Sequence, residues 1–103
     1  MGTFQHHTIV VTAIETRIEK YHEYAEEIFD WVSAISPPLM NGYRSFFVPP
    51  DGGKESMECS HTGDDRREQF INLLKLDGMV DWVEVSYGEL GAEIENSHWG
   101  DER

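Results

Sequence analysis

The sequence predicts an α+β sandwich of the ferredoxin-like type, in which an antiparallel sheet carries two helices on one face. Two stretches of the chain place apolar residues at helical spacing, three short stretches are rich in β-branched or aromatic residues, and residues 54–59 alternate more weakly. Their order is β-α-β-β-α-β, which is the split βαβ pattern of this sandwich. The right-handed crossover rule places the first and third strands at the centre of the sheet.

The first strand and the first helix are expected in the N-terminal third of the chain. Residues 6–13 read HHTIVVTA, and Ile9 and Val11 alternate with partly polar neighbours, which predicts a strand with one covered and one open face. Thr16 and Glu19 form a capping box that predicts the start of a helix. An apolar stripe follows and ends before two consecutive prolines. Its members are Ile18, Tyr21, Ala25, Ile28, Val32 and Ile35.

A hairpin is expected in the middle of the chain. The pair Asn41-Gly42 is a turn signal, and residues 43–48 (YRSFFV) predict the second strand. A loop rich in proline and glycine at 49–53 leads to a weaker third strand at 54–59.

The second helix and the fourth strand follow. Thr62 is the expected cap of the helix, and the Asp77-Gly78 pair is its expected end. The apolar stripe between them consists of Phe70, Ile71, Leu73 and Leu74. Residues 81–87 (DWVEVSY) alternate strictly and predict a half-buried strand.

The 103 residues are expected to form one domain, because a chain of this length can bury one modest core. Within it we expect a short lead at 1–5, a ferredoxin-like core at 6–87 and an acidic, partly ordered tail at 88–103. Cys59 is the single cysteine, and the N-terminus lacks the pattern of a signal peptide, so a reducing cytoplasm is the expected location. The longest apolar run is too short to span a bilayer.

Negative charge is the extreme feature of the composition. Eight Lys and Arg face twenty Asp and Glu, for a net charge of −12, and residues 51–103 hold fourteen of these acids. Such a field repels phosphate backbones and anionic lipid, so we expect no direct binding to nucleic acid or membranes. The charge can serve solubility, or it can present an acidic face that imitates nucleic acid to a basic protein.

A catalytic or metal site is not expected. Cys59 and His61 share a face of the expected third strand, but a free cysteine is more often a small buried hydrophobe. The five histidines are scattered, and His6 and His7 point to opposite faces of a strand, so they do not form a ligand set. The segment 51–54 (DGGK) does not open a helix and is interpreted as a turn. We therefore assign no catalytic residues, metal ligands or cofactors.

The open face of the sheet is the one constellation with binding potential. Aromatic planes beside hydroxyls and a carboxylate can orient a flat ligand or bury a partner. The expected members are Thr8, Val10, Tyr43, Ser45, Phe47, Trp82, Glu84 and Ser86. The alternative is that the C-terminal tail or a second subunit covers this face, and a homodimer is the default expectation.

Four separated blocks carry a specific pattern over most of residues 5–89. They are QHHTIVVTA (5–13), NGYRSFFVPPDGGKE (41–55), GDDRREQFINLLK (63–75) and DWVEVSYGE (81–89). Together they resemble a family of small uncharacterised tailed-bacteriophage proteins with HHTIVVT, NGxxSFxVxPDGxKE and DWVEVxYG blocks. The family usually continues Lys-Glu with Gly-Trp, where this chain has Ser56-Met57. The resemblance implies expression in the cytoplasm of an infected bacterium and an accessory role.

The lead hypothesis is a non-enzymatic phage accessory protein that binds a host protein or a small signalling ligand, and so blunts a host defence. The residues expected to bind the ligand or partner are His7, Thr8, Tyr43, Arg44, Phe47, Trp82 and Glu84. One alternative is an acidic nucleic-acid mimic that inhibits a host nucleic-acid-binding protein. The other is an enzyme that acts on a small substrate through His7, His61 or Glu84.

Overall fold

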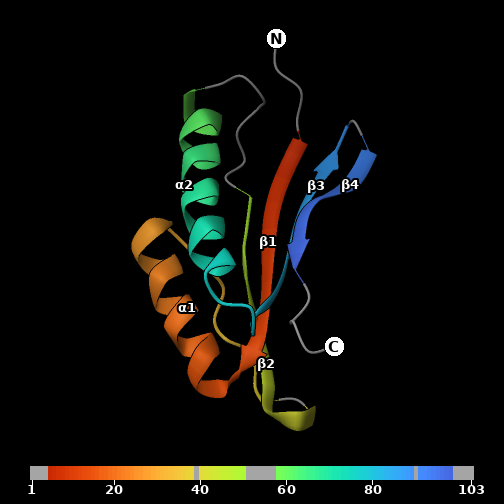
Figure 1. The fold of residues 1–103 in the computed structure, drawn as a ribbon. Helices are drawn as coiled ribbons and strands as arrows, with labels where there is room; N and C mark the ends of the chain where they lie inside the picture. Colours follow the sequence, from red (N-terminus) through yellow and green to blue (C-terminus); the bar gives the residue numbers. More distant parts are fainter. Residues whose placement is uncertain (1–4, 39, 51–57, 90, 99–103) are drawn as a thin grey trace.

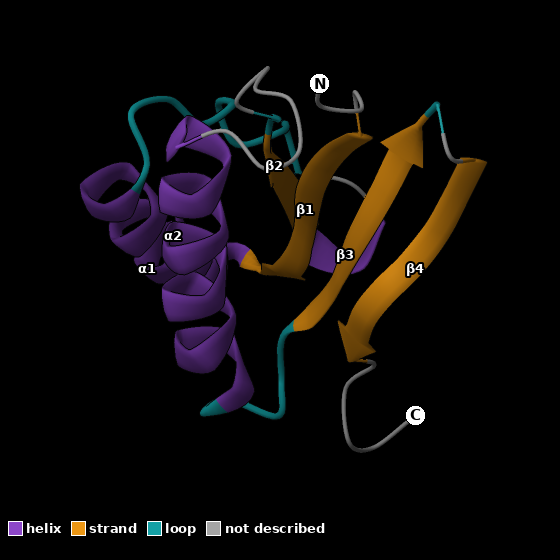
Figure 2. Ribbon diagram, turned by 90° about the horizontal axis from the view of Figure 1, so that it is seen from above, coloured by secondary structure: helices purple, strands orange, loops and turns teal. Residues whose placement is uncertain are grey.

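The computed structural model describes residues 5–38, 40–50, 58–89 and 91–98, without the side chains of residues 15, 40 and 58–64. Four antiparallel strands form one sheet in the order β2-β1-β3-β4, and both helices pack on the same face of it (Figures 1 and 2). The elements are β1 (Gln5–Ile14), α1 (Glu15–Ile28), the 3-10 turn η1 (Met40–Gly42), β2 (Tyr43–Val48), α2 (Glu58–Lys75), β3 (Asp81–Gly88) and β4 (Gly91–His98).

The expected fold class is confirmed, because an antiparallel sheet with two helices on one face fits a ferredoxin-like α+β sandwich. The order of the elements differs from the expected one and is β-α-β-α-β-β in the described residues. Residues 58 and 59 begin α2 instead of ending a third strand, and residues 54–57 lie outside the description. Residues 58–65 hold one β-branched side chain, so little in this stretch favours a strand over a helix. The central strands are β1 and β3, and β2 pairs with β1. Because β3 spans Asp81–Gly88, it is the strand expected as the fourth of the chain, and the expectation of a central third strand was wrong.

The first helix is shorter than its apolar stripe. It begins directly after β1, its N-cap residue Ile14 makes no side-chain cap, and Thr16 lies inside the helix, so the capping-box prediction is wrong. It ends at Ile28 because the chain then extends and pairs with β2: the Ser33 N–H donates to the Phe47 carbonyl at 3.0 Å.

The same segment continues along β2. The Ser36 N–H donates to the Ser45 carbonyl at 2.8 Å, and the Ser36 hydroxyl accepts from the Ser45 N–H at 3.0 Å. Val32 and Ile35 pack on the core from this extended segment rather than from a helix. The segment satisfies backbone groups that would otherwise lie unpaired at the edge of the sheet.

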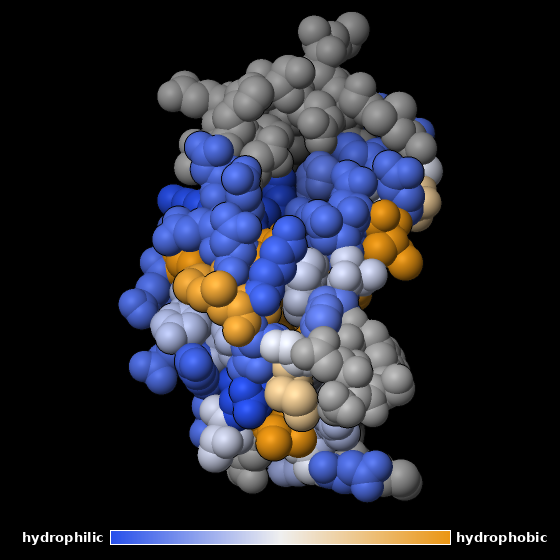
Figure 3. Space-filling model, viewed as in Figure 1, coloured by the Kyte–Doolittle hydropathy of each residue, from blue (hydrophilic) through white to orange (hydrophobic). Residues whose placement is uncertain are grey.

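The core lies between the sheet and the two helices. Its members are aliphatic and aromatic side chains, and hydrophilic side chains cover much of the outer surface of the helices (Figure 3). The buried members are Ile9, Val11, Ala13, Ile18, Tyr21, Ala25, Phe46, Val48, Phe70, Ile71, Leu74, Val80 and Trp82. The apolar stripe predicted for α2 is confirmed, with Phe70 and Leu74 fully buried.

The faces of β1 and β2 agree with the sequence, but the face of β3 does not. Val10 pairs with Val83 across the sheet, so both side chains lie on the open face. Trp82, Glu84 and Ser86 therefore point toward the helices and are 4%, 8% and 2% exposed. The predicted face of β3 was wrong because its valines have the hydropathy of core residues. Side chains alternate between the two faces along a strand, so the register with β1 fixes the face of every residue in β3.

The acidic segment after residue 88 forms β4 over residues 91–98 instead of a tail. Gly88 and Gly91 have φ values of 150° and 97°, and they permit the tight reversal that joins β3 to β4. Ile94, in the middle of this strand, is 66% exposed. The described part of the segment thus extends the plane of the sheet (Figure 2).

A polar cluster connects α1 to the turn after α2. The Arg17 guanidinium pairs with the Asp77 carboxylate, the Tyr21 hydroxyl donates to it at 3.3 Å, and the Met79 N–H donates to it at 3.0 Å. Burial, with a smaller contribution from Asp77, raises the pKa of Tyr21 to about 12. Burial alone would raise the pKa of Asp77, but the Met79 N–H and the Arg17 guanidinium hold it below its usual value.

Candidate functional site

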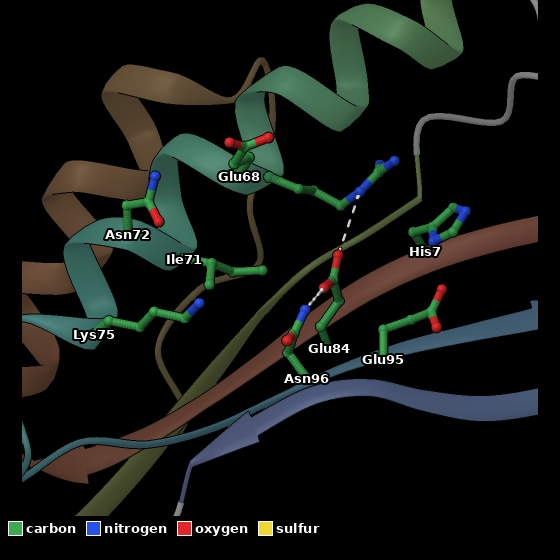
Figure 4. A pocket seen from close by; sticks show the side chains of 9 residues that line it. His7, Glu68, Ile71, Asn72, Lys75, Glu84, Glu95 and Asn96 are labelled. Carbon is green, nitrogen blue, oxygen red and sulfur yellow. Dashed lines mark hydrogen bonds and ion pairs between the residues drawn. The ribbon is translucent and has the colours of Figure 1, made fainter.

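A polar pocket of about 380 Å³ lies between α2 and the β3–β4 end of the sheet (Figure 4). Its size is within the usual range of small-molecule sites. We call it the α2–β4 pocket. It is lined by His7, Arg67, Glu68, Ile71, Asn72, Lys75, Glu84, Glu95 and Asn96.

The helix wall of the pocket follows from helical spacing. Arg67, Ile71 and Lys75 are four residues apart, so they line up on one side of α2. Ile71 is 5% exposed and belongs to the core, so the pocket begins where the apolar packing ends. Figure 4 shows Lys75 extending from α2 toward the sheet.

The sheet wall depends on an irregularity in β4. Glu84 pairs with Asn96, and the next residue of β3, Val85, pairs with Ile94, which leaves Glu95 as an extra residue in β4. This β-bulge turns Glu95 and Asn96 into the same pocket instead of to opposite faces. His7 joins them from β1 (Figure 4).

A buried charge pair forms the floor of the pocket. The Arg67 Nε lies 3.7 Å from Glu84 Oε2, and the two residues are 6% and 8% exposed. The Asn96 side-chain amide donates to Glu84 Oε1 at 2.8 Å. Burying two charges costs free energy that a loose pair only partly recovers, so such pairs are often retained for a task other than stability.

Other charges at the pocket have no partner in the described part of the chain. They are Lys75 and Glu68 on α2 and Glu95 on β4, which are all solvent-exposed. The walls thus present one cation and two carboxylates around the buried pair, which suits a small ligand that carries both charges.

The seven sequence-predicted binding residues do not form one surface. His7 and Glu84 line the α2–β4 pocket, while Thr8, Tyr43 and Phe47 lie on the open face of the sheet. Trp82 is in the core, and its Nε1–H meets no acceptor among the described residues. The Arg44 Nε donates to the Ser36 carbonyl at 2.8 Å, which holds the extended segment against β2. The side chains of Cys59 and His61 lie outside the description.

Sequence reasoning missed most of the pocket. Arg67 and Lys75 lie on the expected second helix outside its predicted apolar stripe, and Glu95 and Asn96 lie in the stretch interpreted as a tail. One signal was available for Arg67: it lies three residues before Phe70 and four before Ile71, so it shares the apolar face of the helix. No sequence pattern predicts the β-bulge that brings Glu95 and Asn96 into the pocket.

A scan against protein-family models and searches of curated proteins and of solved structures found no match to the chain. The described residues contain no group of three or more His, Cys, Asp or Glu side chains that could hold a metal ion. Neither helix, over the residues described, is long and apolar enough to cross a membrane.

Proposed function

We propose that this protein is a non-enzymatic binding protein whose α2–β4 pocket holds a small polar molecule with one anionic and one cationic group. The observation that carries the proposal is the buried Arg67–Glu84 pair at the floor of a pocket of about 380 Å³. A structural pair of this kind is normally enclosed by packing, whereas this one lines an open volume.

The remaining charges support the same ligand class. Lys75 on the helix wall suits a carboxylate or phosphate, and Glu95 on the sheet wall suits an ammonium group. Neither has an ion pair among the described residues, so a ligand would satisfy both without displacing an internal contact. Buried Glu84 would accept a further hydrogen bond from the ligand.

The sequence resemblance supplies the biological context of the proposal. An accessory protein of a bacteriophage that binds a small host molecule would withdraw it from the cell. A signalling molecule of a host defence is the kind of target that gives such withdrawal a consequence.

The experiment measures what the pocket retains. The purified protein is mixed with a small-molecule extract of bacterial cells, separated from unbound molecules by gel filtration and heated, and mass spectrometry identifies what is released. We expect one small charged molecule from the wild type, and about fivefold to tenfold less from Lys75→Met and Glu95→Gln, because each loses one charged contact. Lys20→Met and Glu23→Gln are matched controls, since both residues are exposed on α1.

No released molecule, or equal release from all variants, contradicts the proposal. A basic host protein that binds only at low salt, with no small molecule released, would favour the acidic mimic instead.

An enzyme acting on a small substrate is the second candidate, because His7 and Glu84 line the same pocket. A histidine and a carboxylate at one site can move protons to and from a substrate. In that case the heated protein would release a molecule altered from the one supplied, and His7→Gln would release it unaltered.

A further inference from the structure

We infer that the open face of the sheet is an interface between two copies of this chain. The face consists of the side chains that point away from the helices. Its described members are His6, Thr8, Val10, Thr12, Ile14, Tyr43, Ser45, Phe47, Asp81, Val83, Val85, Tyr87, Ala92, Ile94 and Ser97.

Charge is the first reason to choose a second copy as the occupant. Asp81 is the one acidic side chain among the described members of the face, in a chain with 20 acids in 103 residues. A basic partner protein would need acidic residues on this face, and an anionic partner would need basic residues on it. Two copies with a net charge of −12 each can approach closely only through a face that is nearly free of charge.

Exposed apolar area is the second reason. Val10, Phe47 and Tyr87 are 37%, 43% and 40% exposed, and they lie on three different strands. An apolar hollow of about 280 Å³ also opens on this face, and Val10 and Val83 line it. A side chain of a second copy could fill this hollow.

The chain itself does not cover the face with any described residue. The C-terminal segment was one expected cover, but its described part forms β4 in the plane of the sheet. Both helices lie on the other face (Figures 1 and 2).

The two edges of the sheet are poor alternatives for self-association. Residues 33–36 already pair with the outer edge of β2. The β4 edge carries the bulge at Glu95 and a second acid, Glu93, and both features discourage pairing between edges. Face-to-face packing of two sheets is therefore the mode that remains.

The size of the face is adequate. Four strands about 4.8 Å apart and ~27 Å long present a flat area of ~500 Å² before side-chain relief is counted. This is of the same order as the ~800 Å² that each partner buries in an interface of standard size.

The test is sedimentation equilibrium of the wild type and of charge variants. We expect the wild type to sediment at twice the chain mass of 11.9 kDa. Val10→Glu, at the centre of the face, should sediment at the chain mass while its circular dichroism stays that of the wild type. Leu76→Glu is the matched control, because Leu76 is 83% exposed in the turn after α2, and this variant should remain a dimer.

Complementary charges provide a second readout. Val10 pairs with Phe47 and Val83 near the middle of the sheet, so a twofold axis through the centre of the face brings the two Val10 residues close together. A mixture of Val10→Glu and Val10→Lys should form the dimer that neither variant forms alone. If Val10→Glu fails to fold, Phe47→Ser replaces it and should give a folded monomer.

Salt dependence separates this interface from one based on ion pairs. Screening weakens the repulsion between two acidic copies, so dimerisation should tighten several-fold as ionic strength rises. A monomeric wild type, a dimeric Val10→Glu, a monomeric Leu76→Glu or a dimer that weakens with salt would each overturn the inference.

Discussion

The two faces of the sheet differ in the charged side chains that they carry. The helix-covered face buries the Arg67–Glu84 pair beside an apolar core, although burying charge is costly. The open face, which meets water and could hold charge at no cost, carries Asp81 as its one acid among the described side chains. Solubility and stability alone predict the reverse distribution, so each face has a feature that suits a binding role.

Two adjacent phenylalanines test the contrast most strongly. Phe46 is 2% exposed in the core and Phe47 is 43% exposed on the open face. Phe46→Ala should lower the free energy of unfolding by about 3–5 kcal/mol, because it leaves a cavity among packed rings. Phe47→Ala should lower the unfolding free energy of the monomer by less than about 1 kcal/mol. Urea unfolding at a concentration where the protein is monomeric measures both, and equal losses would contradict the assignment of faces.

The buried pair gives the next largest effect. Arg67→Met leaves Glu84 without its cation in a buried place, and we expect a loss of about 2–4 kcal/mol. The double variant Arg67→Met/Glu84→Met removes both charges and should recover most of that loss, yet release no ligand in the heating experiment. If the double variant is as unstable as the single one, the pair is structural and the pocket loses its main support.

The Asp77 cluster offers a smaller effect with a defined pH range. The pKa of Asp77 is lowered in the fold, so its ionised form stabilises the protein above the unfolded value of 3.8, and this contribution is lost as the pH falls through the folded pKa. Asp77→Asn should therefore cost about 1–2 kcal/mol at pH 7 and progressively less in acid. Unfolding midpoints from pH 7 to pH 2 measure the change, and a constant difference would exclude this origin.

Tyr21 should show the smallest effect, at the alkaline end. Its pKa is raised from 10.0 to about 12 in the fold, so the unfolded chain ionises first and stability falls as the pH rises between these values. Tyr21→Phe removes this fall and should cost about 0.5–1 kcal/mol at pH 7 through its lost hydrogen bond to Asp77. Thermal unfolding between pH 8 and pH 12 compares the two proteins, and parallel curves would contradict the assignment.

The local sequence pattern predicted the structure correctly where neighbouring residues determine it. Residues 43–48 form the predicted strand, and Asn41 and Gly42 adopt the positive φ values of a turn. Phe70 and Leu74 are in the core as their helical spacing predicts. These features depend on neighbours within a few residues, which the sequence shows directly.

The sequence pattern predicted the structure wrongly where pairing between residues far apart in the chain determines it. Val32 and Ile35 continue a helical stripe, yet hydrogen bonds from Ser33 and Ser36 to β2 hold them in an extended segment. The register of β1 with β3 places Val83 outward and Glu84 inward, against their hydropathy. The α2–β4 pocket depends on that register and on the bulge at Glu95, and only His7 and Glu84 among its members were predicted as binding residues.

The two proposals are that the pocket on the helix-covered side of the sheet binds a small molecule and that the open face forms a dimer. Native mass spectrometry of the wild type, after exposure to the bacterial extract, tests both proposals most directly. The account predicts a dimer of the 11.9 kDa chain in which each copy carries one small molecule. It further predicts that Val10→Glu keeps the molecule as a monomer, while Lys75→Met keeps the dimer and carries about fivefold to tenfold less of the molecule. A bare monomer from the wild type, or the loss of both properties in either variant, would contradict it.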